Sequence, residues 1–296
     1  MNDYLIAIII GIVEGLTEFL PVSSTAHIRL VMGLLGVDLE NSYWKMFTVV
    51  IQLGAILAVV VYFWKRIVGF LRTYPRGASG DKKWWSHPVM LVILSFVVTA
   101  IPCYLIDKQI GENLESLHVM GWSLLIGGIL MWVIDVVFSK RAHTDSIEKM
   151  SLVQAVVIGF AQIFAAAFPG TSRSMATIAG GQVMGLSRTA ALEFSFFLSI
   201  PVMCAATAFK LLQFIVKEPV AMTGTQWGVL ATGFVVSFFV AWACIAWFMA
   251  WVRKHGFVPF AIYRIVIGII VLAVASGLIG NTLEPEKPNT EISATE

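Results

Sequence analysis

Residues 14–27 of this chain read EGLTEFLPVSSTAH, and the fold follows from this stretch. It places the carboxylates of Glu14 and Glu18, four hydroxyl side chains and the imidazole of His27 within an otherwise apolar region. Ionisable groups are costly in apolar surroundings, so a cluster of them there indicates a functional site. We therefore take residues 14–27 as one part of such a site.

A break in the middle of this stretch shapes the local structure. Pro21 interrupts the apolar pattern and leaves the segments 4–20 and 25–36 on its two sides. Each segment is shorter than the roughly 20 residues that a membrane-spanning helix needs. We predict a re-entrant helical hairpin that turns at Pro21–Ser24. Its broken backbone must be surrounded by protein or water, since bare backbone is not tolerated at membrane depth.

The composition of the chain places it in a membrane. Of its 296 residues 58% are hydrophobic and only 13% are charged, and the mean hydropathy is +0.84. A soluble domain has about 25% charged residues. We predict an all-α polytopic membrane protein with the lipid bilayer as its surroundings. The net charge of +2 is too small to indicate a nucleic-acid partner.

Six apolar segments are long enough to cross a bilayer. They are Tyr43–Trp64, Pro88–Ile106, Val119–Phe138, Thr189–Leu212, Trp227–Trp251 and Phe260–Ile279. Short loops rich in Lys and Arg stay in the cytoplasm. The basic connections at residues 65–86, 140–141 and 253–255 therefore place both termini outside, and the acidic loop 107–118 fits the outer face.

The second half of the chain repeats the first. A shift of 148 residues places Ile10-Gly11 on Ile158-Gly159, Glu14 on Gln162, Pro21 on Pro169 and Ser24 on Ser172. We predict a second re-entrant hairpin from residues 151–168 and 174–186. Each half then holds one hairpin and three spans, and an odd number of crossings gives the halves opposite orientations, as in transporters built from inverted repeats.

These elements form one integral-membrane domain over residues 1–280. Repeat one covers residues 1–140 and repeat two covers residues 151–280. The tail 281–296 is rich in Pro, Glu, Thr and Ser, and we predict that it is disordered.

The first polar cluster offers a base and a nucleophile. Glu14 and Glu18 are four residues apart and share one helix face, as a general base or as ligands of a divalent cation, Mg²⁺ or Ca²⁺. The alternative is a carboxylate pair at a wet helix end. Ser24 and His27 lie one helical turn apart, which favours acid/base or nucleophilic work, although a lone buried His is more often structural.

Ser23 and Thr25 complete this cluster at the start of the second half-helix. The ordinary role of such hydroxyls is to cap the helix. A helix N-terminus is also an anion site, because its free N–H groups and positive dipole end attract phosphate.

The second polar cluster reads PGTSRSMAT over residues 169–177. A guanidinium at membrane depth, here Arg173, suits a phosphate group. Gly170 permits close approach of the backbone, and Ser172, Ser174 and Thr177 add donors. The alternative is that Arg173 only neutralises the carboxylates of the first cluster.

Other polar residues within the spans give weaker signals. Gln52 lies mid-span and is a candidate phosphate ligand. Glu193 and Lys210 are expected at interfaces. Arg264 lies near the inner end of its span, and we expect its side chain to snorkel toward water.

Both polar clusters resemble motifs of a known protein family. Residues 14–25 with His27, together with residues 169–174, resemble the two signature motifs of the bacterial undecaprenyl-diphosphate phosphatase family of the bacitracin-resistance type. Residues 50–59, 193–196 and 257–264 are also similar, and the resemblance covers about residues 4–280. Ala26 departs from the glycine that is frequent before the His, which leaves the chemistry intact.

The resemblance implies a hydrolase of the bacterial plasma membrane. It would remove the terminal phosphate of undecaprenyl diphosphate and return the lipid carrier to cell-wall synthesis. It also implies a site open to the outer face and a homodimer. We expect no organic cofactor. The functional residues by motif position are Glu14, Glu18, Ser24, His27 and Arg173.

Residues and resemblance together suggest a mechanism. Arg173 and the hairpin N-termini bind the diphosphate, and Ser24 or a water molecule attacks the terminal phosphorus. Glu18 or His27 takes the proton, and Glu14 supports Glu18 or a bound cation. The nucleophile remains open between Ser24, His27 and water. A transporter or flippase of a polyprenyl phosphate is the alternative function that the repeat suggests.

Overall fold

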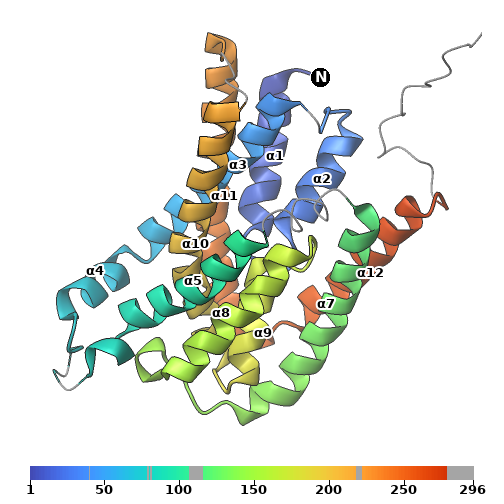
Figure 1. Cartoon of the computed structure of the whole chain (residues 1–296). Helices are drawn as coiled ribbons and strands as arrows, with labels where there is room; N and C mark the ends of the chain where they lie inside the picture. The colour runs from blue at the N-terminus through green and yellow to red at the C-terminus, as the bar shows by residue number, and fades with distance from the viewer. Residues whose placement is uncertain (40, 79, 81, 107–115, 218–221, 279–296) are drawn as a thin grey trace, which may run out of the picture.

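The fold is helical throughout the described part of the chain. The computed structural model describes residues 1–39, 41–78, 80, 82–106, 116–217 and 222–278 (Figure 1). Within these ranges the only strand-like feature is an isolated bridge between Thr144 and Leu186. The predicted all-α class is confirmed. The predicted disordered tail and most of the acidic loop lie outside the described residues.

Helix bounds follow the proline breaks and the polar caps of the sequence. The α-helices are α1 (Asp3–Thr17), α2 (Ser24–Leu34), α3 (Ser42–Tyr62), α4 (Trp64–Thr73), α5 (Pro88–Leu105), α7 (Leu117–Phe138), α8 (Leu152–Ala167), α9 (Arg173–Val183), α10 (Arg188–Lys217), α11 (Gly224–His255) and α12 (Val258–Ala275). Short 3-10 turns are η1 (Trp84–Ser86), η2 (Ser139–Arg141) and η3 (Ile147–Lys149).

Six of these helices are long and apolar enough to cross a membrane. They are α3, α5, α7, α10, α11 and α12. They coincide with the six predicted spans, and only their ends differ by a few residues. The basic connection at residues 65–86 contains a helix that was not predicted, α4, which has no buried residue.

The two predicted hairpins are the pairs α1–α2 and α8–α9. Figure 1 shows their turns meeting near the middle of the molecule. The hydroxyl of Ser174 donates to the carbonyl of Leu20 at 2.9 Å, so the two turns touch. Around them α1 packs on α11, α8 packs on α5, and α7 packs on α12. How the hairpins enter a membrane stays a prediction, as does the inverted repeat.

The register of the predicted repeat is wrong by one residue after the turn. The N-cap residues of α2 and α9 are Ser23 and Ser172, with φ of 74° and 72°. They are the only non-glycine residues with positive φ in the described part of the chain. Ser172 therefore matches Ser23 and not Ser24. The cause is one extra residue after the second proline, because Pro21 lies two positions before Ser23 whereas Pro169 lies three positions before Ser172.

Glycines bring α1 close to its neighbour. A Cβ atom on Gly11 or Gly15 would lie 2.8 Å from the carbonyl oxygen of Gly233 or Ser237 on α11. Small residues allow such close approach of helices in membranes. The carboxylate-bearing helix α1 is thus seated directly against a long span.

A buried ion pair fixes the end of the molecule away from the hairpin turns of α1–α2. Asp135 on α7 is fully buried and accepts from Arg188 Nε at 2.7 Å, from Gln182 Nε2 at 2.9 Å and from the backbone N–H of Phe257 at 3.0 Å. A buried charge is stable only when it is paired and hydrogen-bonded. Asp135 therefore joins α7, α9, α10 and the start of α12.

One prediction about the spans is wrong. Arg264 does not snorkel to water, because its side chain is fully buried inside the protein. Its partners are backbone carbonyls that come from distant parts of the chain.

Candidate active site

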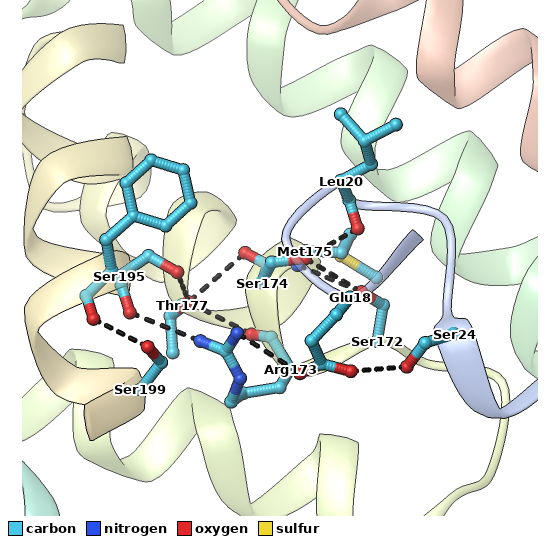
Figure 2. Close-up of polar contacts among 11 residues, drawn as sticks. Glu18, Leu20, Ser24, Ser172, Arg173, Ser174, Met175, Thr177, Ser195 and Ser199 are labelled. Atoms are coloured by element: carbon cyan, nitrogen blue, oxygen red, sulfur yellow. Dashed lines mark hydrogen bonds and ion pairs between the residues drawn. The ribbon is translucent and has the colours of Figure 1, made fainter. Parts of the chain in front are cut away.

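The centre of the site is a contact between Glu18 and Ser24. Helix α1 ends at Thr17, and Glu18 caps it through its backbone N–H to the carbonyl of Glu14. The turn at Pro21 then reverses the chain, so that the first residue of α2 faces the end of α1. The hydroxyl of Ser24 donates to Glu18 Oε2 at 2.5 Å (Figure 2). A hydroxyl held this way has a base in place to receive its proton.

Arg173 reaches the other oxygen of Glu18. It is the first residue of α9, and its Nη2 lies 3.4 Å from Glu18 Oε1 while its Nη1 donates to the carbonyl of Ser195 at 3.2 Å. Its side chain is 13% exposed, and its Nε has no hydrogen-bond partner among the described residues. The long ion pair and the unused Nε leave donors for an anion.

The backbone around these residues is strained. Ser23 and Ser172 adopt positive φ immediately before Ser24 and Arg173. Such a conformation costs about 1–3 kcal/mol in a non-glycine residue, and it concentrates at functional sites. In both hairpins it turns the first residue of the following helix toward the Glu18 carboxylate.

The other hydroxyls of the second cluster have partners within the protein. Ser172 accepts from the backbone N–H of Met175 and lies 3.0 Å from Ser174 Oγ. Thr177 Oγ1 lies 2.7 Å from Ser195 Oγ and 2.9 Å from the carbonyl of Arg173. These predicted phosphate ligands line the site, and in this state they support the turn and the helix.

His27 is held away from the Ser24–Glu18 contact. Its Nδ1 lies 2.8 Å from the carbonyl of Ser23 and must be the donor, because a carbonyl only accepts. In the neutral ring Nε2 then accepts from the hydroxyl of Tyr263, at 2.7 Å. The two rings stack at 5.5 Å. Ser24 therefore has Glu18, and not His27, as its nearest base.

Tyr263 is a residue of the site that the sequence did not reveal. It lies on α12, 236 positions from His27 along the chain. The only signal was its place in a segment that resembles the family.

Glu14 has no hydrogen-bond partner among the described residues. Its side chain is fully buried, and neither carboxylate oxygen has a hydrogen bond to a described residue. Gln162, the residue that the repeat matches to Glu14, is equally buried and unpartnered. Mg²⁺ in phosphate-handling sites is held by one or two carboxylates together with substrate phosphates. Glu14 fits that role better than Glu18, whose two oxygens are engaged.

The remaining candidates differ in their proximity to this centre. Thr25 is exposed on the first turn of α2. Gly170 has a φ of 92°, and a Cβ atom there would lie 2.5 Å from the carbonyl oxygen of Met120, so only glycine fits. The side chain of Gln52 is half-buried on α3 and forms no hydrogen bond to any residue that the structure describes. In the same part of the chain, no group of three or more His, Cys, Asp or Glu could hold a metal ion.

An apolar groove adjoins the site. It has a volume of about 850 Å³ and lies between α1, α11 and α12. Its lining includes Leu16, Leu20, Ala243, Trp247, Phe260 and Tyr263. Tyr263 thus lines the groove and also binds His27 through its hydroxyl, which links the groove to the polar cluster.

Comparison with known proteins places the chain in a family. The family model described as "Bacitracin resistance protein BacA" matches residues 7–270. The chain belongs to this family. Two of its relatives are named "Undecaprenyl-diphosphatase". The relative from Koribacter versatilis (strain Ellin345) is 55% identical over 283 residues, which cover 93% of this chain and 99% of that protein. The relative from Novosphingobium aromaticivorans (strain ATCC 700278 and its equivalents) is 43% identical and covers 92% and 98%.

Membership in the BacA family agrees with the two motifs from which the resemblance was drawn. Together with the six long apolar helices, it makes the chain a multi-pass membrane protein. The BacA model covers both hairpins and all six spans, except for the first residues of α1 and the last residues of α12.

Proposed function

We propose that this protein removes the terminal phosphate of undecaprenyl diphosphate and yields undecaprenyl phosphate, so that the lipid carrier returns to cell-wall synthesis. The names of the BacA-family relatives support the substrate and the reaction. The observation that carries the chemistry is the Ser24–Glu18–Arg173 contact, with nucleophile, base and anion ligand in one line of interactions. A transporter of a polyprenyl phosphate, the alternative, is not favoured by these relatives.

The proposed reaction uses these groups in order. Arg173 binds the terminal phosphoryl group, since its guanidinium offers donors that suit phosphate. Ser24 Oγ attacks the terminal phosphorus and its proton passes to Glu18, while the bridging P–O bond breaks and undecaprenyl phosphate leaves. Water then hydrolyses the phosphoserine and releases inorganic phosphate. Charge neutralisation and alignment dominate phosphoryl transfer, which matches the small number of groups present.

His27 and water remain the alternatives to Ser24 as nucleophile. If one of these alternatives holds, Glu18 still activates the attacking group. The contacts of His27 with Ser23 and Tyr263 then fix the orientation of its ring. Rapid quenching with phosphorus-labelled substrate should trap phosphoserine at Ser24. Phosphohistidine in the quenched protein would assign the attack to His27 instead.

A direct assay tests the function. The purified protein in detergent, given undecaprenyl diphosphate, should release one inorganic phosphate per lipid and leave the monophosphate. The same protein in vesicles without phosphate release, but with movement of lipid between leaflets, would contradict the hydrolase and support the transporter.

The proposed cation site is at Glu14 and Glu18. A bound Mg²⁺ or Ca²⁺ would neutralise charge on the diphosphate oxygens. We expect a chelator to lower the rate of phosphate release and added Mg²⁺ or Ca²⁺ to restore it, with Glu14→Gln losing the response to the cation. Full activity of thoroughly chelated protein would contradict the site.

We further propose the placement of the protein in the cell. The basic connections near α4, η2 and the end of α11 support a plasma-membrane protein with both termini outside. The site would then face the outer side, between two re-entrant hairpins of an inverted repeat. A homodimer remains a proposal that rests on the resemblance alone.

The apolar groove is proposed to hold the first isoprene units of the lipid. Its continuity with Tyr263 and its position along α1 would place the chain beside the Ser24–Glu18 contact. Pockets of 300–1,000 Å³ are typical of small-molecule sites, and each buried CH₂ contributes about 0.8 kcal/mol.

Filling the groove tests this placement. Ala243→Trp should raise the KM for undecaprenyl diphosphate by about tenfold, because losing about two CH₂ contacts corresponds to that change. Activity on farnesyl diphosphate, whose short chain needs less of the groove, should fall less. Ala246→Trp is the matched control, since Ala246 is exposed on the same helix and does not line the groove. Equal effects of the two variants would contradict the placement.

A further inference from the structure

Arg264 is the largest completely buried side chain among the described residues. Its Nη1 donates to the carbonyl of Pro21 at 3.1 Å, and its Nη2 donates to the carbonyls of Gly170 at 2.9 Å and Ser123 at 3.2 Å. Among the described residues it has no carboxylate partner. A buried guanidinium that binds only carbonyls is costly, so its position calls for a role.

The acceptors of Arg264 come from three separate segments. Pro21 lies in the turn of the first hairpin, between Glu18 and Ser24. Gly170 lies in the turn of the second hairpin, just before Ser172 and Arg173. Ser123 belongs to α7, the helix that packs against α12. One planar fork therefore joins the two turns that carry the reacting groups and ties both to α7.

The neighbouring helix leaves space for this fork. Gly127 on α7 lies against the guanidinium, and a Cβ atom there would overlap Arg264 Nη2 and lie 3.3 Å from its Cζ. A larger residue at position 127 would therefore push the guanidinium off its acceptors. The side chain of Arg264 is thus held from both sides, by its hydrogen bonds and by the α7 surface.

The direct contact between the two halves of the site is too long to hold them. Arg173 Nη2 and Glu18 Oε1 are 3.4 Å apart, whereas strong charge-assisted bonds are about 2.7–2.9 Å. A phosphate that enters between them must lengthen this contact further. The separation of the halves is instead set by the backbone ties at Leu20, through Ser174, and at Pro21 and Gly170, through Arg264.

We propose that Arg264 is a positioning residue for phosphoanhydride hydrolysis: by binding the carbonyls of both hairpin turns, it fixes the distance from the Ser24–Glu18 pair to Arg173. The kinetic tests of this inference rest on the proposed function, whereas the contacts that Arg264 makes do not. Its action is on alignment, and it does not contact the substrate. Misplacing a reacting group by about 1 Å costs about 10²-fold in rate.

Arg264→Lys separates geometry from charge. Lysine keeps the positive charge but is a single point that lacks the planar fork, so it does not serve three carbonyls in the same way. We expect kcat for phosphate release to fall about 10²-fold with KM nearly unchanged. Near-wild-type kcat in Arg264→Lys would overturn the proposal and leave Arg264 a role in charge only. A rise in KM at unchanged kcat would also overturn it.

Gly127→Ala tests the same alignment without altering Arg264. It should displace the guanidinium and lower kcat in the same direction. The matched control is Gly121→Ala, also on α7, where a Cβ atom would crowd Leu272 of α12 instead. Both variants strain the α7–α12 contact and should lower the thermal midpoint alike. Equal loss of kcat in the two variants would assign Arg264 to stability only.

A distance measurement tests the geometry independently of turnover. Spin labels at Leu34 and Val183, exposed near the ends of α2 and α9, report how the two hairpins sit relative to each other once the native cysteines are replaced. The distance distribution should widen in Arg264→Lys and Gly127→Ala but not in Gly121→Ala. An unchanged distribution in all three overturns the inference. Absence of phosphate release by the wild-type protein would instead refute the proposed function, and this measurement would still decide the role of Arg264.

Discussion

Replacing Glu18 by Gln is expected to lower kcat for phosphate release by about 10²–10⁴-fold, the usual contribution of a general base. The amide has nearly the same shape as the carboxylate, so it can still accept the Ser24 hydroxyl and fill the same space. What it cannot do is take the proton when Ser24 Oγ attacks. KM should change less than kcat, because the substrate is bound mainly by Arg173.

The matched control for this change is Glu148→Gln. Glu148 also pairs with an arginine, Arg66, but its side chain is 36% exposed and lies outside the site. Steady-state kinetics with thermal unfolding of each variant separates catalysis from folding. Near-wild-type kcat in Glu18→Gln would show that Glu18 is not the base. The proton of the Ser24 hydroxyl would then have to pass to His27.

Replacing Arg173 by Lys is expected to lower kcat by about 10³–10⁵-fold, the range over which an arginine stabilises the transition state of phosphoryl transfer. Lysine preserves the charge opposite Glu18 but loses the planar fork that binds phosphate oxygens in pairs. Arg173→Ala should also abolish hydrolysis. It additionally leaves Glu18 without its ion-pair partner, which costs about 3–5 kcal/mol in a buried pair.

Arg66→Lys is the control for the charge-preserving change. Arg66 binds Glu148 and Glu193 in a comparable fork but away from the hairpin turns. If Arg173→Lys retained turnover close to that of Arg66→Lys, the role of Arg173 as the phosphate ligand would be refuted. An intact thermal midpoint in both variants would show that the comparison concerns catalysis.

The spans and the hairpin breaks were predictable because they are local properties. The long apolar segment of α3 identifies it as a span. Pro21 and Pro169 end the half-helices whatever the rest of the chain does. The polar stretch at residues 14–27 was recognisable for the same reason. The register after the turn was not, since one extra residue between Pro169 and Ser172 shifts α9 without leaving a signal in composition.

Contacts across the chain decided what the sequence could not. The spacing of Ser24 and His27 suggested that they act together. In the structure, however, His27 is hydrogen-bonded to Tyr263, and Ser24 donates its hydrogen bond to Glu18. Arg264 was assigned to water because an arginine near the end of a span usually reaches it. Its acceptors are 94, 141 and 243 positions away, so no local pattern announced them.

The distance along the chain between Pro21 and Arg264 has a consequence for synthesis. The turn that carries Glu18 and Ser24 is made early, while the residue that holds its carbonyl follows 243 positions later. At translation rates of about 5–20 residues per second, roughly 10–50 s separate the two. We expect the nascent protein to stay inert in the bilayer until its last helix is inserted, and chains truncated before α12 to hydrolyse nothing.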